Sequence, residues 1–315
     1  MRVPILNTRM SNRFLSAAAL AIGLLACSCA WAQNELVVAQ YMHNYFAVNP
    51  SFAGSRECLS IFGSFRKQWA GVESTPASML LTANTPLRRE KLTLGLSLYN
   101  QTIRESRNTG AMLSVGYRTR VGKSAWLGLA LQPGAAFRSA DWTKMRTMQA
   151  DDPVFAEKHT GVAPLLGLGV SVYGDNFFAG VSSSSLLVTD DFDKVDTEFA
   201  PADATYLLCG GYWFNLGHSF ALQPSVLADY SKATDAAANF SLSAIWRDMV
   251  GLTAAYRTNK DATFGLAYQP NERIKVAYNY AMSLGDVKSY NSGSHEISLQ
   301  YDFVYRVKTV SHRFY

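Results

Sequence analysis

Apolar residues alternate with small or polar residues almost without interruption from residue 238 to residue 307. In the first run, Phe240 and Leu242 alternate with Ser241 and Ser243. Successive side chains of a β-strand point to opposite faces, so this period of two gives each strand one apolar face and one face of small and polar residues. Two architectures use such strands: a water-soluble sandwich or barrel with the apolar face inward, and a membrane barrel with it outward.

The same pattern predicts about fourteen strands, an even number that is usual for single-chain bacterial outer-membrane barrels. Odd-numbered connections between these strands are mostly long, such as residues 100–108 and 139–160, and even-numbered ones are mostly short, such as Gly122-Lys123 and Gly174-Asp175. Long extracellular loops and short periplasmic turns are typical of outer-membrane barrels. Before the five strands of the last third, we expect strands over residues 58–69, 77–84, 91–99, 111–121, 125–137, 162–173, 176–183, 205–215 and 219–230.

The face opposite the apolar one favours the membrane barrel over a soluble all-β protein. It is rich in Gly, Ser and Ala, and it carries Arg118, Arg247, Arg257, Lys275 and Arg306. That composition suits a polar lumen better than a solvated surface. We therefore predict an all-β fold, a transmembrane outer-membrane β-barrel of about fourteen antiparallel strands with both termini on the periplasmic side.

The first 32 residues have the features of a secretory signal peptide. A basic start precedes an apolar run over residues 15–26 and the small residues Ala30 and Ala32, so we expect cleavage before Gln33. Two alternatives stay open: initiation at Met10, and lipidation of Cys27 in place of this cleavage.

The rest of the chain divides into an irregular segment and the barrel. Residues 33–56 contain the turn-forming Asn49-Pro50 and Gly54, and we expect a periplasmic or lumenal lead-in with one helical turn. Residues 57–315 form the predicted barrel.

Charge and motifs exclude several functions. Of the formal charge of +5, three units come from arginines of the first 32 residues, and the +2 that remains argues against a nucleic-acid partner. Nucleophile-elbow, phosphate-loop and zinc-protease motifs are absent, and the five histidines lack ligand spacing, so no catalytic residue, metal or cofactor is expected. Cys58 and Cys209 could pair or stay free.

Several short sequence motifs carry a more specific signal. They are Gln40-Tyr41, Asn49-Pro50-Ser51-Phe52-Ala53-Gly54, Arg66-Lys67-Gln68-Trp69-Ala70-Gly71 and Gly293-Ser294-His295-Glu296-Ile297. With these words the chain closely resembles the PorP/SprF family of type IX secretion system membrane proteins, although Ser51 and Phe52 depart from the Ala-Tyr expected there.

The resemblance implies a non-catalytic outer-membrane component of the type IX secretion system of Bacteroidetes-type bacteria. Such a component supports export or surface attachment of cargo proteins, including gliding adhesins. The implied partners are the periplasmic ring and peptidoglycan-linked components, cargo with a C-terminal sorting domain, and outer-membrane lipid. A passive diffusion channel, or a barrel enzyme acting on lipids or peptides, is the alternative.

The family words also supply the candidate site. If the alternation of the first strand persists, Arg66 and Gln68 face the lumen, where they can bond the lead-in or a partner, and Trp69 faces the lipid interface as an anchor. His295 and Glu296 are adjacent on a strand and therefore point to opposite faces. The candidate residues are Asn49, Pro50, Gly54, Arg66, Gln68, Trp69, Gly71, His295 and Glu296.

Overall fold

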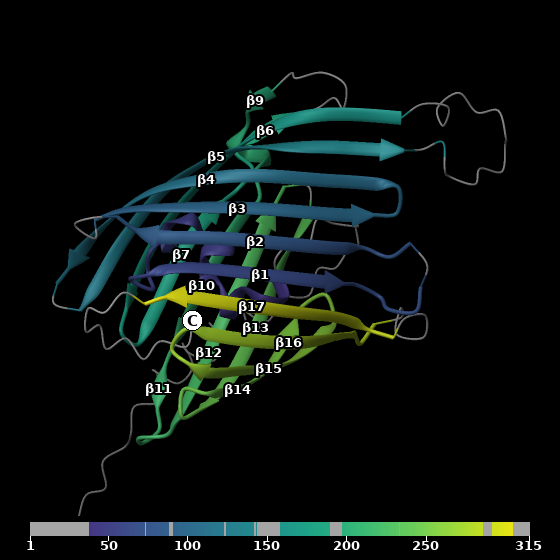
Figure 1. Cartoon of the computed structure of the whole chain (residues 1–315). Helices are drawn as coiled ribbons and strands as arrows, with labels where there is room; N and C mark the ends of the chain where they lie inside the picture. Colours follow the sequence, from purple (N-terminus) through teal and green to yellow (C-terminus); the bar gives the residue numbers. More distant parts are fainter. Residues whose placement is uncertain are drawn as a thin grey trace, which may run out of the picture. The chain divides into compact units, whose positions relative to one another are not determined.

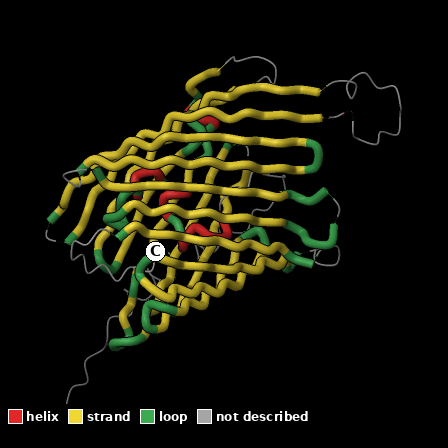
Figure 2. The backbone as a smooth tube through the Cα atoms, in the orientation of Figure 1, coloured by secondary structure: helices red, strands yellow, loops and turns green. Residues whose placement is uncertain are grey.

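The computed structural model describes residues 38–72, 74–87, 91–122, 124–141, 143, 158–189, 197–232, 234–285 and 292–304, so the predicted signal peptide lies outside them. In this part of the chain, long strands surround a few short helices, which Figures 1 and 2 show inside the ring of strands. No helix of the described residues is both long and apolar enough to span a membrane.

The strands form one antiparallel sheet in which each strand pairs with the next along the chain, and β1 pairs with β17 to close a barrel. Trp213 interrupts one strand, so the fifteen strands of the sheet amount to fourteen, as predicted. Their bounds are β1 Leu59–Lys67, β2 Ala77–Pro86, β3 Leu92–Ile103, β4 Ser106–Val121, β5 Ala125–Asp141, β6 Lys158–Gly174, β7 Phe177–Ser183, β10 Tyr206–Tyr212, β11 Phe214–Asn215, β12 Phe220–Ser231, β13 Thr234–Trp246, β14 Val250–Arg257, β15 Asp261–Asn271, β16 Ile274–Ser283 and β17 Ser294–Phe303.

The remaining elements are short. Strands β8 Leu187–Thr189 and β9 Thr197–Phe199 form a separate hairpin in the connection between β7 and β10, which also holds the 3₁₀-helix η6 Pro201–Asp203. Three more 3₁₀-helices precede the barrel: η1 Val38–His43, η2 Tyr45–Ala47 and η3 Pro50–Phe52.

The two faces of the strands confirm the predicted membrane barrel. Leu252 is 59% exposed on the outer face, whereas its neighbour Thr253 is 7% exposed on the inner face. The same alternation holds along β4 and β13, where leucines and valines point outward and Ser114 and Ser241 are buried. An outward apolar belt around a polar interior is the arrangement of a transmembrane β-barrel.

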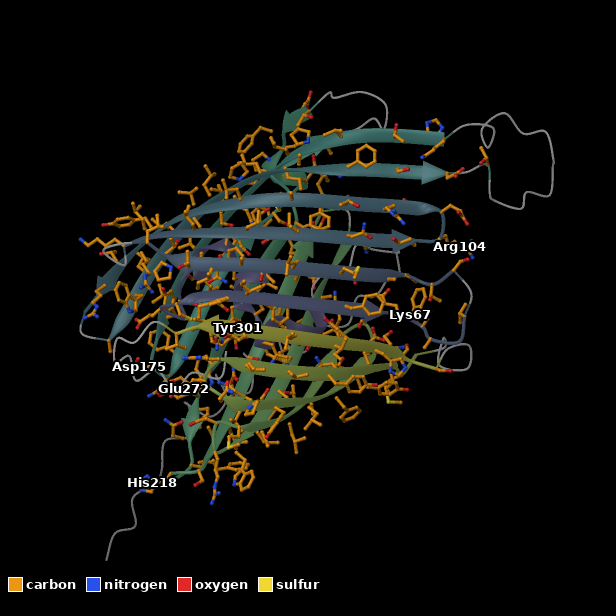
Figure 3. The ribbon with its side chains drawn as sticks, viewed as in Figure 1. Lys67, Arg104, Asp175, His218, Glu272 and Tyr301 are labelled. Atoms are coloured by element: carbon orange, nitrogen blue, oxygen red, sulfur yellow. The ribbon has the colours of Figure 1, made fainter. Side chains whose placement is uncertain are left out.

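The connections differ in part from the prediction. Residues 100–108 do not form a long loop, because their polar side chains still belong to paired strands and only Arg104 and Glu105 remain for the turn. The long connections are those between β1 and β2, β5 and β6, β7 and β10, and β16 and β17. They lie at the end of the barrel that carries Lys67 and Arg104, opposite Asp175 and Glu272 (Figure 3).

One inward-facing prediction is also wrong. Arg247 lies in the turn between β13 and β14 with a positive φ, and its guanidinium stacks on Trp246 at 5.0 Å from the ring centroid. The strand ends at Trp246, so the alternation that placed Arg247 in the lumen has already stopped. Arg118, Arg257 and Lys275 are buried on the inner face as predicted.

Candidate functional site

The lumen contains the lead-in. Residues 38–57 contain three successive 3₁₀-helices rather than one helical turn, and these lie inside the ring of strands (Figure 2). Tyr41, Asn49 and Ala53 are completely buried, and Phe46 and Phe52 nearly so. We call residues 38–57 the lumenal segment.

Local sequence explains the bend at its centre. Asn49 caps η3 with its side-chain oxygen, which accepts hydrogen bonds from the Ser51 backbone N–H at 3.0 Å and the Ser51 hydroxyl at 2.7 Å. Pro50 occupies the first helical position, where its missing N–H costs nothing. Gly54 then turns the chain with a φ of +70°, and a side chain there would collide with the backbone of Pro86.

One wall of the lumen is shaped around Asn49. Its amide donates to the carbonyl oxygens of Val170 on β6, at 3.0 Å, and Val181 on β7, at 3.2 Å. A β-carbon at Gly169 or Gly180 would overlap the Asn49 side chain, so these strand glycines form the socket that admits it.

On the other side of β10, strands β12 and β13 hold the segment through hydroxyl groups. The Tyr41 hydroxyl lies 3.0 Å from the Ser225 hydroxyl of β12 and 2.9 Å from the Ser241 hydroxyl of β13. On the same wall, the Gln223 amide donates to the hydroxyl of Tyr45. The lumenal segment therefore bridges β6 and β7 to β12 and β13.

A third set of contacts comes from β2 and β4. The Arg118 guanidinium, 1% exposed, donates to the carbonyl oxygen of Gly54 at 2.8 Å and stacks on Trp126 at 4.5 Å. The backbone N–H of Gly54 donates to Asn84 at 2.9 Å. These contacts fix the glycine turn from both sides.

Charged groups close the end of the segment onto β17. Arg56 donates to one carboxylate oxygen of Asp302 through Nε at 2.9 Å and a terminal nitrogen at 2.6 Å. The Gln300 amide donates to the same carboxylate at 3.0 Å, and Lys275 is buried nearby. Burial, and then the charge of Lys275, lower the pKa of His43 well below its usual value.

Aromatic rings fill the space between the segment and β6 and β7. The ring of Tyr45 lies 4.1 Å from that of Phe178, and Phe52 lies 5.7 Å from Tyr173. Such pairs contribute about 0.5–1.5 kcal/mol each beyond their burial. Beside His43 a residual cavity of about 20 Å³ remains, which is room for about one water molecule.

The other candidate residues lie at the far ends of β1 and β17. Arg66 is the register partner of Glu296, whose buried carboxylate it faces. His295 is on the opposite face, where its Nδ1 lies 2.7 Å from the Tyr278 hydroxyl. The prediction that His295 and Glu296 point to opposite faces is thus confirmed.

One expectation about this rim is corrected. The alternation of β1 ends at Lys67, and Trp69 lies beyond it with a φ of +48°. The backbone N–H of Trp69 donates to the Ser294 hydroxyl at 3.2 Å. The chain reverses there because Gly71 also adopts a positive φ. Hydrogen bonds from Arg66 and Gln68 to the lead-in stay a prediction, whereas the partners of Asn49 and Gly54 come from β2, β4, β6 and β7.

Sequence reasoning missed several contacts of the lumenal segment. The Arg56–Asp302 pair and the Tyr41 bonds join residues about two hundred positions apart, and neither carries a local pattern. Cys58 and Cys209 are both buried and free, and burial raises the pKa of the Cys58 thiol to about 12. In the described part of the chain, no three His, Cys, Asp or Glu side chains are placed to share a metal ion.

The chain is similar to several solved structures, among them a porin, a phospholipase and a transporter. The chain is 8% identical to a KdgM porin, with a TM-score of 0.37 and coverage of 78% of this chain and 99% of that one. It is 12% identical to outer membrane phospholipase A from Escherichia coli, with a TM-score of 0.37 and coverage of 81% of this chain and 98% of that one. It is 10% identical to the toluene transporter TodX from Pseudomonas putida, with a TM-score of 0.47 and coverage of 85% of this chain and 94% of that one.

No curated protein matches the sequence. A family model described as "Type IX secretion system membrane protein PorP/SprF" matches residues 30–301, which include the lumenal segment and nearly the whole barrel. The chain therefore belongs to the PorP/SprF family of type IX secretion system membrane proteins.

Proposed function

We propose that this protein is a non-catalytic outer-membrane component of the type IX secretion system that supports export or surface attachment of cargo through protein–protein contacts. Family membership supports the link to the secretion system. The observation that carries the contact role is the lumenal segment, which hydrogen-bonds to strands β2, β4, β6, β7, β12 and β13 of the barrel. A lumen occupied in this way favours a scaffold over a passive diffusion channel.

The proposed orientation places the short turns and both termini in the periplasm. The short connections at Asp175 and Glu272 lie at one end, and the long connections at the other, which is the usual sorting in outer-membrane barrels. In this orientation the periplasmic ring and peptidoglycan-linked components contact the end of the barrel at which the lumenal segment leads into β1. Cargo with a C-terminal sorting domain meets the opposite rim, near Arg66 and Trp69.

The rim residues suit such contacts. Trp69 is exposed, and aromatic side chains are enriched among residues that contribute strongly to protein interfaces. Gly71 keeps the loop backbone close to Ser292, whose side chain would lie 3.2 Å from an added β-carbon. The first and last strands of the barrel therefore present a single joined loop region.

The test is a gene deletion complemented with the wild-type chain, read out by mass spectrometry of surface and secreted proteins and by small-solute uptake. We expect a subset of secreted proteins to disappear while solute uptake stays unchanged, and pull-down from detergent extracts to recover secretion components. An unchanged secretome with impaired uptake would instead identify a diffusion channel. Turnover of added lipids or peptides by purified protein would contradict the non-catalytic role.

A further inference from the structure

The outer face of β17 and β1–β6 carries an apolar depression of about 820 Å³, within the roughly 300–1,000 Å³ range of small-molecule sites. Its floor consists of small residues, Gly63, Ala111 and Ala135, while larger side chains on the neighbouring rows form its walls. The walls include Phe65, Met79, Phe137, Val162 and Ile297, and Leu81 lies in the same row as the floor residues, opposite Gly63.

The depression is open because of residue size and not because of a backbone defect. A β-carbon at Gly63 would meet only a methyl group of Leu81, at 3.9 Å, which is an ordinary contact. A larger side chain at this position would therefore extend into the depression without displacing the sheet. This gives a direct way to fill the depression.

A row of basic side chains borders the depression at the rim. Phe65 pairs with Ile297 and Met79, and two residues further along the strand Lys67 pairs with His295 and Ala77. That step along a strand is about 7 Å. Alternation places Lys67 on the same outer face as Phe65, and both side chains are exposed.

The row continues across the sheet. Ala77 pairs with Thr102, and Thr102 pairs with Arg107, which is also exposed. Three strand spacings separate Arg107 from Lys67, about 14 Å. Among the described residues neither cation has a hydrogen-bonding or ion-pair partner, so both are available to an external anion.

His295 adds a third donor beside Lys67. Its Nδ1 is bonded to the Tyr278 hydroxyl at 2.7 Å, and the ring of Tyr280 lies 5.3 Å from the imidazole. When Tyr278 donates this bond, the imidazole proton is on Nε2 and can be donated outward. Tyrosines at such a boundary are typical of the membrane–water interface.

We propose that this face binds a phosphate-bearing, acylated lipid, with an acyl chain in the depression and phosphate groups at Lys67, His295 and Arg107. The apolar floor and the cationic border are complementary to the two parts of such a molecule. A free phosphate would use only the border, and a neutral lipid only the depression. The site lies on the lipid-facing surface and does not depend on the lumenal segment.

The test measures binding of diphosphorylated lipid A to the full mature chain in detergent, by native mass spectrometry. We expect Lys67→Gln with Arg107→Gln to weaken binding about tenfold or more, the loss typical of removing charge-assisted hydrogen bonds. Gly63→Leu should weaken it by filling the depression. Lys260→Gln, which removes a cation from a turn at the same end but away from the depression, is the matched control and should bind normally.

Two further probes distinguish the sources of phosphate. Dephosphorylated lipid A should bind at least about tenfold more weakly than the phosphorylated form, as expected if charged bonds hold the headgroup. Inorganic phosphate should fail to displace the lipid at equal concentration. Equal binding of the dephosphorylated lipid, full displacement by inorganic phosphate, or wild-type binding by the charge and groove variants would each overturn the proposal. If Gly63→Leu does not fold, as judged by gel mobility with and without heating, Ala111→Leu fills the same floor.

Discussion

Replacing Asn49 with alanine should release the lumenal segment. The side chain is fully buried and makes four hydrogen bonds, two within η3 and two to the carbonyls of Val170 and Val181. Loss of a helix N-cap costs about 0.5–2 kcal/mol, and each bond to a strand carbonyl about 0.5–1.5 kcal/mol. The closed lumen should therefore lose about 1.5–5 kcal/mol, which shifts the ratio of closed to open barrels about 10- to 5,000-fold.

Single-channel recording in planar bilayers measures this ratio directly. Wild-type protein should conduct rarely, and Asn49→Ala should open more often by about the 10- to 5,000-fold factor that the lost hydrogen bonds predict. Asn49→Asp separates the two contributions, because the carboxylate can still cap η3 but cannot donate to Val170 and Val181. It should therefore open nearly as often as Asn49→Ala.

Asn271 provides the matched control. Its side-chain oxygen accepts from the backbone N–H groups of Arg273 and Ile274, both at 2.9 Å, in an exposed turn outside the lumen. Asn271→Ala should leave conductance at the wild-type level. If Asn49→Ala conducts no more than Asn271→Ala while both barrels show the heat-dependent gel shift, the hydrogen bonds of Asn49 do not hold the lumen closed.

Three more predictions address other parts of the chain. Asp302→Ala removes the buried carboxylate that pairs with Arg56 and should cost about 3–5 kcal/mol, seen as frequent channel opening; near-wild-type closure would show that the ion pair is dispensable. Because the pKa of His43 is lowered in the closed state, closure should weaken as pH falls below the unperturbed value of about 6.5, and His43→Phe should remove this pH dependence of conductance. Trp69→Ala should chiefly reduce barrel yield or heat resistance, whereas Arg66→Ala with Gln68→Ala should leave the barrel inserted but impair export; normal export by the double variant would exclude a functional role for that pair.

The barrel could be predicted from the sequence because its determinants are local. A period of two shows which face of a strand meets lipid, and it is visible in the burial of long strands such as β4, β14 and β17. The strand ends were less predictable. Beyond the apolar belt the alternation of apolar and polar residues disappears, yet backbone pairing continues, as it does from Asn100 to Ile103.

The site could be predicted only in part, because its contacts are long-range. The turn chemistry of Asn49, Pro50 and Gly54 is readable from the sequence, but their partners on β2, β4, β6 and β7 are set by closure of the barrel. The motif around Trp69 at the rim was misinterpreted for a different reason. Alternation was extended to Trp69 across a backbone that had already left the strand.

The glycines of the inner face connect the local sequence of the strands with the long-range contacts of the lumenal segment. Gly95, Gly128, Gly169 and Gly180 are each placed where a β-carbon would strike an atom of the lumenal segment. Glycine in a strand interior is unfavourable by itself, so these positions are accounted for by the close approach of another chain segment. The segment contains only 3₁₀-helices of three to six residues, too short to be stable alone. Its structure must therefore form against the closed wall, which makes the occupied lumen a product of barrel folding and leaves the rims and the outer face as the surfaces open to partners.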